Sequence, residues 1–303
     1  MTTAPTRPPT SAPLVSVIVP AYNSAGYLTE AVRSVLDQTF PGVEVVVVND
    51  GSTDETGAVA EALRAQDARV RVVHQQNMGL PSARNSGIRE ARGEYLAFLD
   101  ADDIIRPEKV ASQLAYLEAH PGCDLVYSDY SRADEDLRPL SDDPISIRRM
   151  SLRDAYAYTN VFPVMSPLLR RSLVERVGNF DPALRACEDW DFWIRCERAG
   201  NFGYLPGYFS VYRMHGTQMH KDYRFMLKYC RMVAQKNYPR GSRHYRSMLG
   251  SFLWWQFGLR KGQLTRFQAL FSPQVLGIAL RMLWEVRSPR EAWFIRQSFR
   301  HGL

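Results

Sequence analysis

The sequence lacks the patterns of zinc-finger, disulfide-rich and membrane-spanning proteins. Its four cysteines show no CxxC spacing and stand apart at Cys123, Cys187, Cys196 and Cys230. They indicate neither a zinc site nor a disulfide framework, and a reducing cytoplasm is the expected compartment. The longest uncharged runs of the C-terminal region, Ser247–Leu259 and Phe267–Leu280, are too short to cross a bilayer.

The first thirteen residues, MTTAPTRPPTSAP, contain no apolar stretch of the kind found in a signal peptide. They are rich in Pro and Thr, which favours solvated chain over a packed element. We therefore expect a disordered leader over residues 1–13.

The net charge of +6 conceals two oppositely charged regions. Residues 1–219 carry 22 Lys/Arg and 29 Asp/Glu, a net charge of −7, and would repel a nucleic-acid backbone. With no nucleic-acid-binding motif present, we expect no nucleic-acid partner. Residues 220–303 carry 16 basic and 3 acidic residues, a net charge of +13, together with 15 aromatic residues. We expect this region to be helical, and either to pack as a subdomain core or dimer interface or, in addition, to contact an anionic membrane surface.

Apolar, β-branched runs alternate with helical patterns through the first half of the chain. The expected strands are Leu14–Pro20, Val43–Val48, Val70–Val73, Glu94–Leu99 and Asp124–Ser128. The expected helices are Ala25–Gln38, Asp54–Gln66, Pro81–Ala91 and Ile104–Ala119. This alternation predicts an α/β fold with a mostly parallel central sheet and helices on both faces. Around Ser131–Arg149, charge and Pro increase and periodicity fades, so we expect a surface loop.

Three carboxylates, Asp100, Asp102 and Asp103, directly follow the apolar strand Glu94–Leu99. The carboxyl ends of parallel strands form the ligand-binding edge of an open α/β sheet. Clustered carboxylates repel one another, and Mg²⁺ or Mn²⁺ relieves this repulsion while bridging to phosphate oxygens. The alternative is that Asp102 or Asp103 caps a helix starting near Pro107.

Two earlier strands also end in polar residues. The first is followed by Tyr22 and Asn23, and the second by Asp50 within Asn49–Asp54. The ring of Tyr22 is suited to stacking, and Asp50 to accepting hydrogen bonds from a base or ribose; the alternative is an ordinary turn that caps the next helix. In the run Asn77–Gly87, small residues suit close packing of a helix on the sheet, whereas Arg84 suits either this packing or an anionic ligand.

Four motifs, in their order and spacing, resemble those of the family 2 glycosyltransferases, which have the GT-A fold: PAYN, NDGSTD, NxGxxxARNxG and GEYLAFLDADD. The resemblance covers roughly residues 14–215. It implies a catalytic domain over 14–219, with a nucleotide-sugar half at about 14–128 and an acceptor half at about 150–219. It also implies a metal-dependent, inverting transfer of sugar from a nucleotide-diphosphate sugar to a hydroxyl. The acceptor would be a glycan or a lipid-linked molecule in cell-surface polysaccharide or glycolipid synthesis, at the cytoplasmic face of the plasma membrane.

The resemblance assigns a role to each strand-end residue. Tyr22 should stack on the base, Asp50 should contact the base, and Asp100 should face the ribose or the outer shell of the metal. Asp102 should bind Mn²⁺ or Mg²⁺ directly, with Asp103 a weaker candidate. The other expected donor-binding residues are Pro20, Asn23, Arg84, Ala101 and Arg213, the last by neutralising leaving-group charge.

A second acidic pair, in Cys187–Arg195, resembles the ED motif of the family at a helix start. Asp189 matches the position of the general base, and Glu188 should orient the acceptor or the base; the alternative is that both merely favour the helix start. Asp191 should pair with Arg195 four residues later. The neighbouring aromatic residues are either core or a sugar platform: Trp190, Phe192 and Trp193.

His215 follows an apolar stretch, Tyr204–Val211. The resemblance implies that it binds the metal or phosphate, although a lone His is usually structural. Two other functions compete with glycosyl transfer. A sugar-nucleotide nucleotidyltransferase would need a Gly-rich, basic loop after the first strand, where this chain has PAYNSAGY. A non-catalytic nucleotide-sugar binder is disfavoured because Asp102, Glu188 and Asp189 are all present.

Overall fold

The structure is a computed structural model that describes residues 14–143, 151–157, 159–216 and 222–249. The expected leader and most of the basic C-terminal region lie outside these residues. The chain divides into two compact units. The first unit comprises the chain up to Asp142 together with two later segments, Val164–Asn179 and Gly200–Arg213. The second comprises Asp143–Pro163, Phe180–Ala199 and the chain from Met214 onward.

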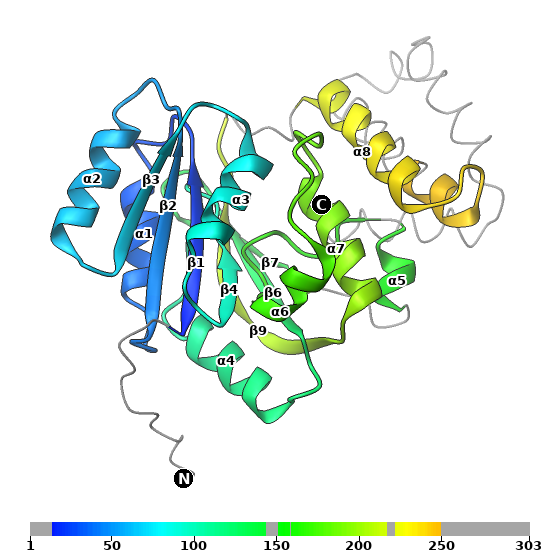
Figure 1. Cartoon of the computed structure of the whole chain (residues 1–303), viewed down its shortest axis with the longest axis horizontal. Helices are drawn as coiled ribbons and strands as arrows, with labels where there is room; N and C mark the ends of the chain where they lie inside the picture. Colours follow the sequence, from blue (N-terminus) through cyan, green and yellow to red (C-terminus); the bar gives the residue numbers. More distant parts are fainter. Residues whose placement is uncertain (1–13, 144–150, 158, 217–221, 250–303) are drawn as a thin grey trace. The chain divides into compact units, whose positions relative to one another are not determined.

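A nine-stranded sheet forms the centre of the first unit, with strand order β3-β2-β1-β4-β8-β6-β9-β5 and β7 paired to β6 (Figure 1). The strands are β1 Val15–Ala21, β2 Val43–Asp50, β3 Val70–Gln75, β4 Tyr95–Phe98, β5 Ile104–Ile105, β6 Leu125–Ala133, β7 Pro139–Asp143, β8 Leu168–Arg170 and β9 Phe202–Arg213. Strands β3, β2, β1 and β4 are parallel. Strand β8 then runs antiparallel to both β4 and β6, whereas β6 and β9 are parallel.

Strands β1 and β2 are buried along their whole length because helices cover both faces of the sheet. Helices α1 (Leu28–Leu36) and α2 (Thr56–Gln66) lie on one face, and α3 (Leu80–Glu90) lies on the other (Figure 1). Gly87 lets α3 approach β1 closely, because a Cβ at this position would collide with Ile18. The expected α/β fold, including the role of small residues in α3, is confirmed.

The strand order places a topological switch point between β1 and β4. From β1 the chain crosses over to β2 and then β3, whereas β4 returns to the other side of β1. Val15 pairs with Val43 on one side and with Tyr95 on the other, so the three strands are in step. Their carboxyl ends therefore meet at one edge, where ligands bind in folds of this type.

Two expectations about secondary structure are wrong. Ile104–Ala119 is not one helix: Ile104 and Ile105 pair with β9, and helix α4 begins at Lys109, after Pro107. The segment Ser131–Arg149 is not all loop, because β6 continues to Ala133 and β7 pairs with it. In both segments, pairing with a neighbouring strand decides the conformation, although the local sequence shows no strand periodicity.

The second unit is mainly helical in its described residues. Its helices are α5 Leu152–Ala155, α7 Glu188–Ala199 and α8 Tyr223–Asn237, followed by helical residues 243–249. Helix α6, Arg171–Val177, belongs to the first unit, as do α1 to α4. None of the helices in the described part of the chain combines the length and apolarity needed to cross a membrane.

Candidate functional site

The loops after β1 and β2 are tied together by hydrogen bonds. The side chain of Asn23 accepts a hydrogen bond from the backbone N–H of Thr53 at 2.8 Å, and the Asn23 N–H donates to Ser52 Oγ at 3.1 Å. Asn23 has a φ of 49°, in the left-handed region that Asn tolerates better than most residues. Tyr22, directly before it, is 48% exposed. The fixed loop thus presents an aromatic ring to solvent, as stacking requires.

Asp50, at the end of β2, is buried but keeps acceptor capacity. Its carboxylate accepts hydrogen bonds from Gln75 Nε2 at 2.7 Å and from the N–H groups of Met78 at 2.9 Å and Gly79 at 2.8 Å. A carboxylate offers about four lone-pair sites, so these bonds leave room for a ligand N–H. Gly51 is required here, because its φ is +69° and a Cβ would lie 2.5 Å from the backbone nitrogen of Asn77.

Arg84, on α3, forms an ion pair with Asp100. Arg84 is 1% exposed, and its Nη2 lies 2.6 Å from Asp100 Oδ1. The buried guanidinium therefore fixes the loop that begins the carboxylate cluster and offsets one of its charges. Direct contact of Arg84 with a ligand stays a prediction.

The other two carboxylates differ in exposure. Asp102 is half-buried, whereas Asp103 is 1% exposed. Asp103 Oδ1 accepts a hydrogen bond from the Arg213 N–H at 2.8 Å, and no described group donates to its buried Oδ2. Burial, followed by the charges of Asp102 and Asp100, raises the pKa of Asp103 well above its usual range. Like-charge repulsion of this kind is relieved by a divalent cation, for which Asp102 has the more exposed carboxylate.

The capping alternative for this cluster is wrong, because α4 has Glu108 at its N-cap and no side-chain cap. After β2 the turn is present, since Asp54 Oδ1 accepts the Thr56 N–H at 3.0 Å, but the expected cap at Thr53 or Asp54 is wrong, because the N-cap of α2 is Glu55, which makes no side-chain cap. No group of three or more His, Cys, Asp and Glu side chains within the described residues is arranged as a metal site.

Arg213, at the end of β9, holds the backbone of the carboxylate cluster. Its Nε donates to the main-chain oxygen of Asp102 at 2.7 Å and its Nη1 to that of Glu135 at 2.7 Å. Its Nη2 forms an ion pair with Glu30 of α1 at 2.5 Å. Arg213 is 3% exposed. The structure thus gives it a positioning role, and its predicted contact with the leaving group stays a prediction.

The expected acidic pair begins α7 in the second unit, as predicted. Glu188 is buried and Asp189 is half-buried. Asp189 Oδ1 accepts the N–H of Trp190 at 2.8 Å, and its Oδ2 accepts Asn160 Nδ2 at 2.7 Å. Cys187, just before the pair, has a φ of 56°, which is strained for a non-glycine residue.

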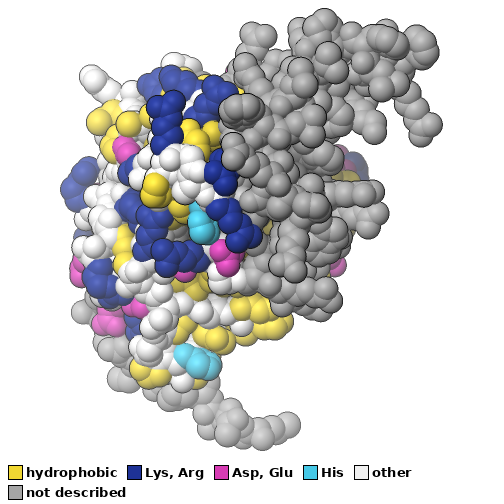
Figure 2. Space-filling view, turned by 90° about the vertical axis from the view of Figure 1, so that its right-hand side faces the viewer, with side chains coloured by type: hydrophobic (Ala, Val, Ile, Leu, Met, Phe, Trp, Pro, Cys, Tyr) yellow, Lys and Arg dark blue, Asp and Glu magenta, His cyan; other side chains and the backbone are white. Residues whose placement is uncertain are grey.

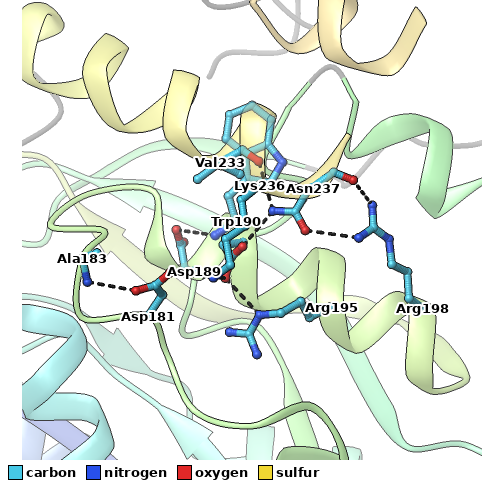
Figure 3. A network of polar contacts seen from close by, with 10 residues as sticks. Asp181, Ala183, Asp189, Trp190, Arg195, Arg198, Val233, Lys236 and Asn237 are labelled. Atoms are coloured by element: carbon cyan, nitrogen blue, oxygen red, sulfur yellow. Dashed lines mark hydrogen bonds and ion pairs between the residues drawn. The ribbon is translucent and has the colours of Figure 1, made fainter. Parts of the chain in front are cut away.

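Asp191, two residues further along α7, is completely buried and accepts three hydrogen bonds. The donors come from three of the residues labelled in Figure 3: Arg195, Lys236 and Asn237. Asp191 Oδ2 lies 2.9 Å from Arg195 Nε, which confirms the predicted pair. The same oxygen lies 3.0 Å from Lys236 Nζ, and Oδ1 accepts Asn237 Nδ2 at 2.7 Å. The last two donors come from the end of α8.

The aromatic residues after the acidic pair belong to the core. Phe192 and Trp193 are fully buried, with Phe192 stacked on Phe180 at 4.2 Å between ring centroids. Trp190 is 6% exposed, and its Nε1 donates to the main-chain oxygen of Tyr156 at 3.0 Å. The sugar-platform interpretation is therefore wrong for these rings.

The predicted site residues fall into two groups. The first unit holds Pro20, Tyr22, Asn23, Asp50, Arg84, Asp100, Ala101, Asp102 and Arg213, most of them at the carboxyl edge of the sheet. The second unit holds Glu188, Asp189 and His215. Sequence reasoning missed three residues that carry no local motif and lie far away in sequence: Asn160, which contacts Asp189, and Lys236 and Asn237, which contact Asp191.

Sequence comparison relates the chain to bacterial glycosyltransferases. It is 36% identical over 189 residues to the uncharacterized glycosyltransferase EpsJ of Bacillus subtilis, covering 59% of this chain and 55% of EpsJ. It is 30% identical over 228 residues to an uncharacterized glycosyltransferase of Haemophilus influenzae, covering 70% of this chain and 68% of that protein. The chain spans less than two thirds of the length of the first curated relatives that it matches.

Two solved structures share the fold. One is S. aureus TarS in complex with UDP-GlcNAc, with a TM-score of 0.65 at 22% identity, covering 94% of this chain and 85% of that chain. The other is the mannosyltransferase PcManGT from Pyrobaculum calidifontis in complex with GDP-Man and Mn²⁺, with a TM-score of 0.61 at 19% identity, covering 92% and 89%. The sequence profile of Glycosyl transferase family 2 matches residues 16–178, more than half of the chain. The chain therefore belongs to glycosyl transferase family 2.

Proposed function

We propose that the chain transfers a sugar from a nucleotide-diphosphate sugar to a hydroxyl acceptor, with inversion at the anomeric carbon and with a divalent cation. The observation that carries this proposal is the composition of one sheet edge. Three parallel strands end there. Strand β1 is followed by the exposed ring of Tyr22, β2 ends in the carboxylate of Asp50, which has spare acceptor capacity, and β4 is followed by the carboxylate cluster Asp100–Asp103. A base, a ribose and a diphosphate need these three kinds of group.

A nucleotide-diphosphate donor is supported by the ligands of the two structural neighbours, UDP-GlcNAc and GDP-Man. In this chain, Tyr22 would stack on the base while Asp50 accepts a hydrogen bond from it. Asp100 would face the ribose. The turn residues beside these side chains would line the same pocket: Pro20, Asn23 and Ala101.

The cation, Mn²⁺ or Mg²⁺, would be held by Asp102, with His215 as a second candidate ligand. Mn²⁺ is present in one of the structural neighbours. Bound there, the cation would neutralise negative charge on the departing diphosphate. Arg84 would support the site by fixing Asp100, and Arg213 by fixing the main chain of Asp102.

Asp189 would be the general base. Its half-buried carboxylate would take the proton of the acceptor hydroxyl as that oxygen bonds to the anomeric carbon and the bond to the diphosphate breaks. Its two oxygens are held by Trp190 N–H and Asn160 Nδ2, so the base is oriented before the acceptor binds. Glu188 would orient the acceptor.

The test is a panel of nucleotide sugars with Mn²⁺, Mg²⁺ or chelator, in which released nucleoside diphosphate and thermal shift are measured. We expect metal-dependent stabilisation and release with one donor class. A thermal shift without release from any donor and acceptor would indicate a non-catalytic binder. Formation of a nucleotide sugar from a nucleoside triphosphate would indicate a nucleotidyltransferase.

We further propose a glycan or lipid-linked acceptor in cell-surface polysaccharide or glycolipid synthesis, reached at an anionic membrane surface. Lys and Arg side chains gather on one face of the molecule (Figure 2). In the second unit, the exposed Arg153, Arg198 and Arg243 lie around Asp154 and Glu197, with basic side chains in excess. Flotation with anionic and neutral liposomes tests the membrane contact. We expect binding to anionic vesicles only, weakened by salt, and absence from both would contradict it.

A further inference from the structure

The end of α8 supplies two of the groups that hold the first turns of α7. Lys236 Nζ lies 3.0 Å from Asp191 Oδ2, and Asn237 Nδ2 lies 2.7 Å from Asp191 Oδ1. Asp191 is 0% exposed. Burial of a carboxylate to this degree is costly unless charged or hydrogen-bonding groups satisfy it. Loss of a donor from α8 would therefore disturb α7 at this position.

Lys236 also reaches the segment that leads into α7. Its Nζ lies 2.7 Å from Asp181 Oδ2, and this hydrogen bond lowers the pKa of Asp181. Asp181 Oδ1 in turn accepts the N–H of Ala183 at 2.9 Å. One ammonium group thus joins the loop before the acidic pair to the helix after it (Figure 3).

The backbone between these two anchors is strained. Cys187 has a φ of 56°, and a non-glycine residue keeps this conformation only where surrounding contacts impose it. Glu188 and Asp189 follow directly. The direction in which the Asp189 carboxylate points therefore depends on how firmly Asp181 and Asp191 are held on either side.

We propose that Lys236 and Asn237 are positioning residues for the general base Asp189, so that the C-terminal region contributes to catalysis through α8. They act through Asp181 and Asp191, not by touching the substrates. This inference rests on the proposed function of Asp189. It assigns α8 a role beyond the packing or membrane contact expected for a basic C-terminal region.

The kinetic test compares two variants of the full chain, Lys236→Met and Lys228→Met. Both variants remove one positive charge from an exposed lysine of α8, but Lys228 lies eight residues before Lys236 and contacts the ring of its neighbour Tyr229. We expect Lys236→Met to lower kcat about 10- to 100-fold, the scale of a misplaced reacting group, with donor KM and donor affinity unchanged. Lys228→Met should match the wild type. Lys236→Arg, which keeps the charge, should recover part of the loss.

A second measurement does not depend on turnover. Hydrogen exchange of the peptide that spans Ala186–Asp191 should be faster in Lys236→Met than in the wild type, and unchanged in Lys228→Met. Unchanged exchange would overturn the proposal even if no donor or acceptor has been found. Faster exchange with wild-type kcat would also overturn it, because the contact would then be structural only.

A double-mutant cycle tests the route of the effect. If Lys236 acts through Asp181 and Asp191, Lys236→Met should lower kcat much less in an Asp181→Asn/Asp191→Asn background than in the wild type. Equal effects in the two backgrounds, or an equal loss of donor affinity, would overturn the inference. Asn237→Ser provides an independent variant, with the same expected kinetics, should Lys236→Met fail to fold. Absence of transfer by the wild type with every donor would instead contradict the proposed function.

Discussion

The acidic residues at the sheet edge of the first unit and those around α7 in the second are stabilised in different ways. In the second unit, Asp181 and Asp191 share Lys236, and Asp191 also pairs with Arg195. These two carboxylates are thus matched by two cationic side chains, Lys236 and Arg195. In the first unit, an ion pair joins Asp100 to Arg84. The pKa of Asp103 there is raised by burial and by its acidic neighbours.

This difference indicates different uses. A cluster whose charges are balanced internally needs no ligand and serves to fix a backbone. A cluster of adjacent carboxylates at a ligand-binding edge, in which burial and the neighbouring charges raise the pKa of Asp103, is suited to a cation that arrives with the donor. The predictions below separate these two uses.

Asp189→Asn should have the largest effect. An amide cannot accept the proton of the acceptor hydroxyl, so we expect kcat to fall by about 10²-fold or more while donor affinity stays nearly unchanged. Steady-state kinetics and calorimetry with the donor measure the two quantities. Asp191→Asn is the matched variant on the same helix; compared with Asp189→Asn it should lower kcat less and stability more, because it disturbs the position of the base without removing it. The reverse pattern would show that the wrong carboxylate has been named the base.

Asp102→Asn should act on the donor instead. Loss of a charged metal ligand should weaken metal-dependent donor binding by at least about 10- to 100-fold, a range seen even for indirect partners of a metal. Calorimetry with Mn²⁺, Mg²⁺ and chelator measures this change. Equal affinity of variant and wild type under all three conditions would contradict the metal assignment and leave the cluster without its proposed use.

Much of the first unit was predictable because its signals are local. Apolar runs such as Val43–Val48 mark strands buried on both faces, and polar residues mark their ends. The Asp191–Arg195 pair followed from helical spacing alone. Contacts between distant segments leave no such pattern. Nothing near Asn160 indicates Asp189, and nothing near Lys236 indicates Asp191.

The short strands were missed for the same reason. Ile104 and Ile105 pair with β9, about a hundred residues later, and Pro139–Asp143 becomes a strand because β6 is beside it. In both cases the partner strand decides the conformation, and the residues themselves show neither period 2 nor a long apolar run.

Two lysine environments, one exposed and one buried, extend the comparison. Lys236 has two carboxylates, whereas Lys109 in the first unit is 1% exposed and contacts the neutral oxygens of Gln113 at 2.5 Å and Pro167 at 3.5 Å. Burial lowers the pKa of Lys109 to about 7 from its ordinary value of 10.5. Between pH 7 and pH 10.5, Lys109 is protonated in the unfolded chain and neutral in the folded one. This group therefore makes the free energy of unfolding rise with pH from about 7 to about 10.5.

We therefore expect Lys109→Met to flatten this dependence. Denaturant unfolding at pH 7 and pH 9 should show wild-type stability rising relative to the variant by about 2 kcal/mol, the linkage expected for one proton over this interval. Other groups titrate equally in both proteins and cancel in the difference. Parallel stability curves for the two proteins would contradict the low pKa of Lys109.

Asn160→Ala should have the smallest effect, and it tests how the second unit prepares its base. Asn160 Nδ2 donates to Asp189 Oδ2 at 2.7 Å, while Trp190 N–H holds the other oxygen at 2.8 Å. A hydrogen bond to a charged group contributes about 1.5 kcal/mol or more, so its loss should lower kcat roughly 10-fold and leave donor affinity unchanged. The remaining bond from Trp190 keeps the loss below that of Asp189→Asn. If Asn160→Ala lowers kcat as much as Asp189→Asn does, Asn160 must contact the acceptor itself. If kcat is unchanged, the base is oriented by α7 alone, and the second unit fixes Asp189 entirely through its helix.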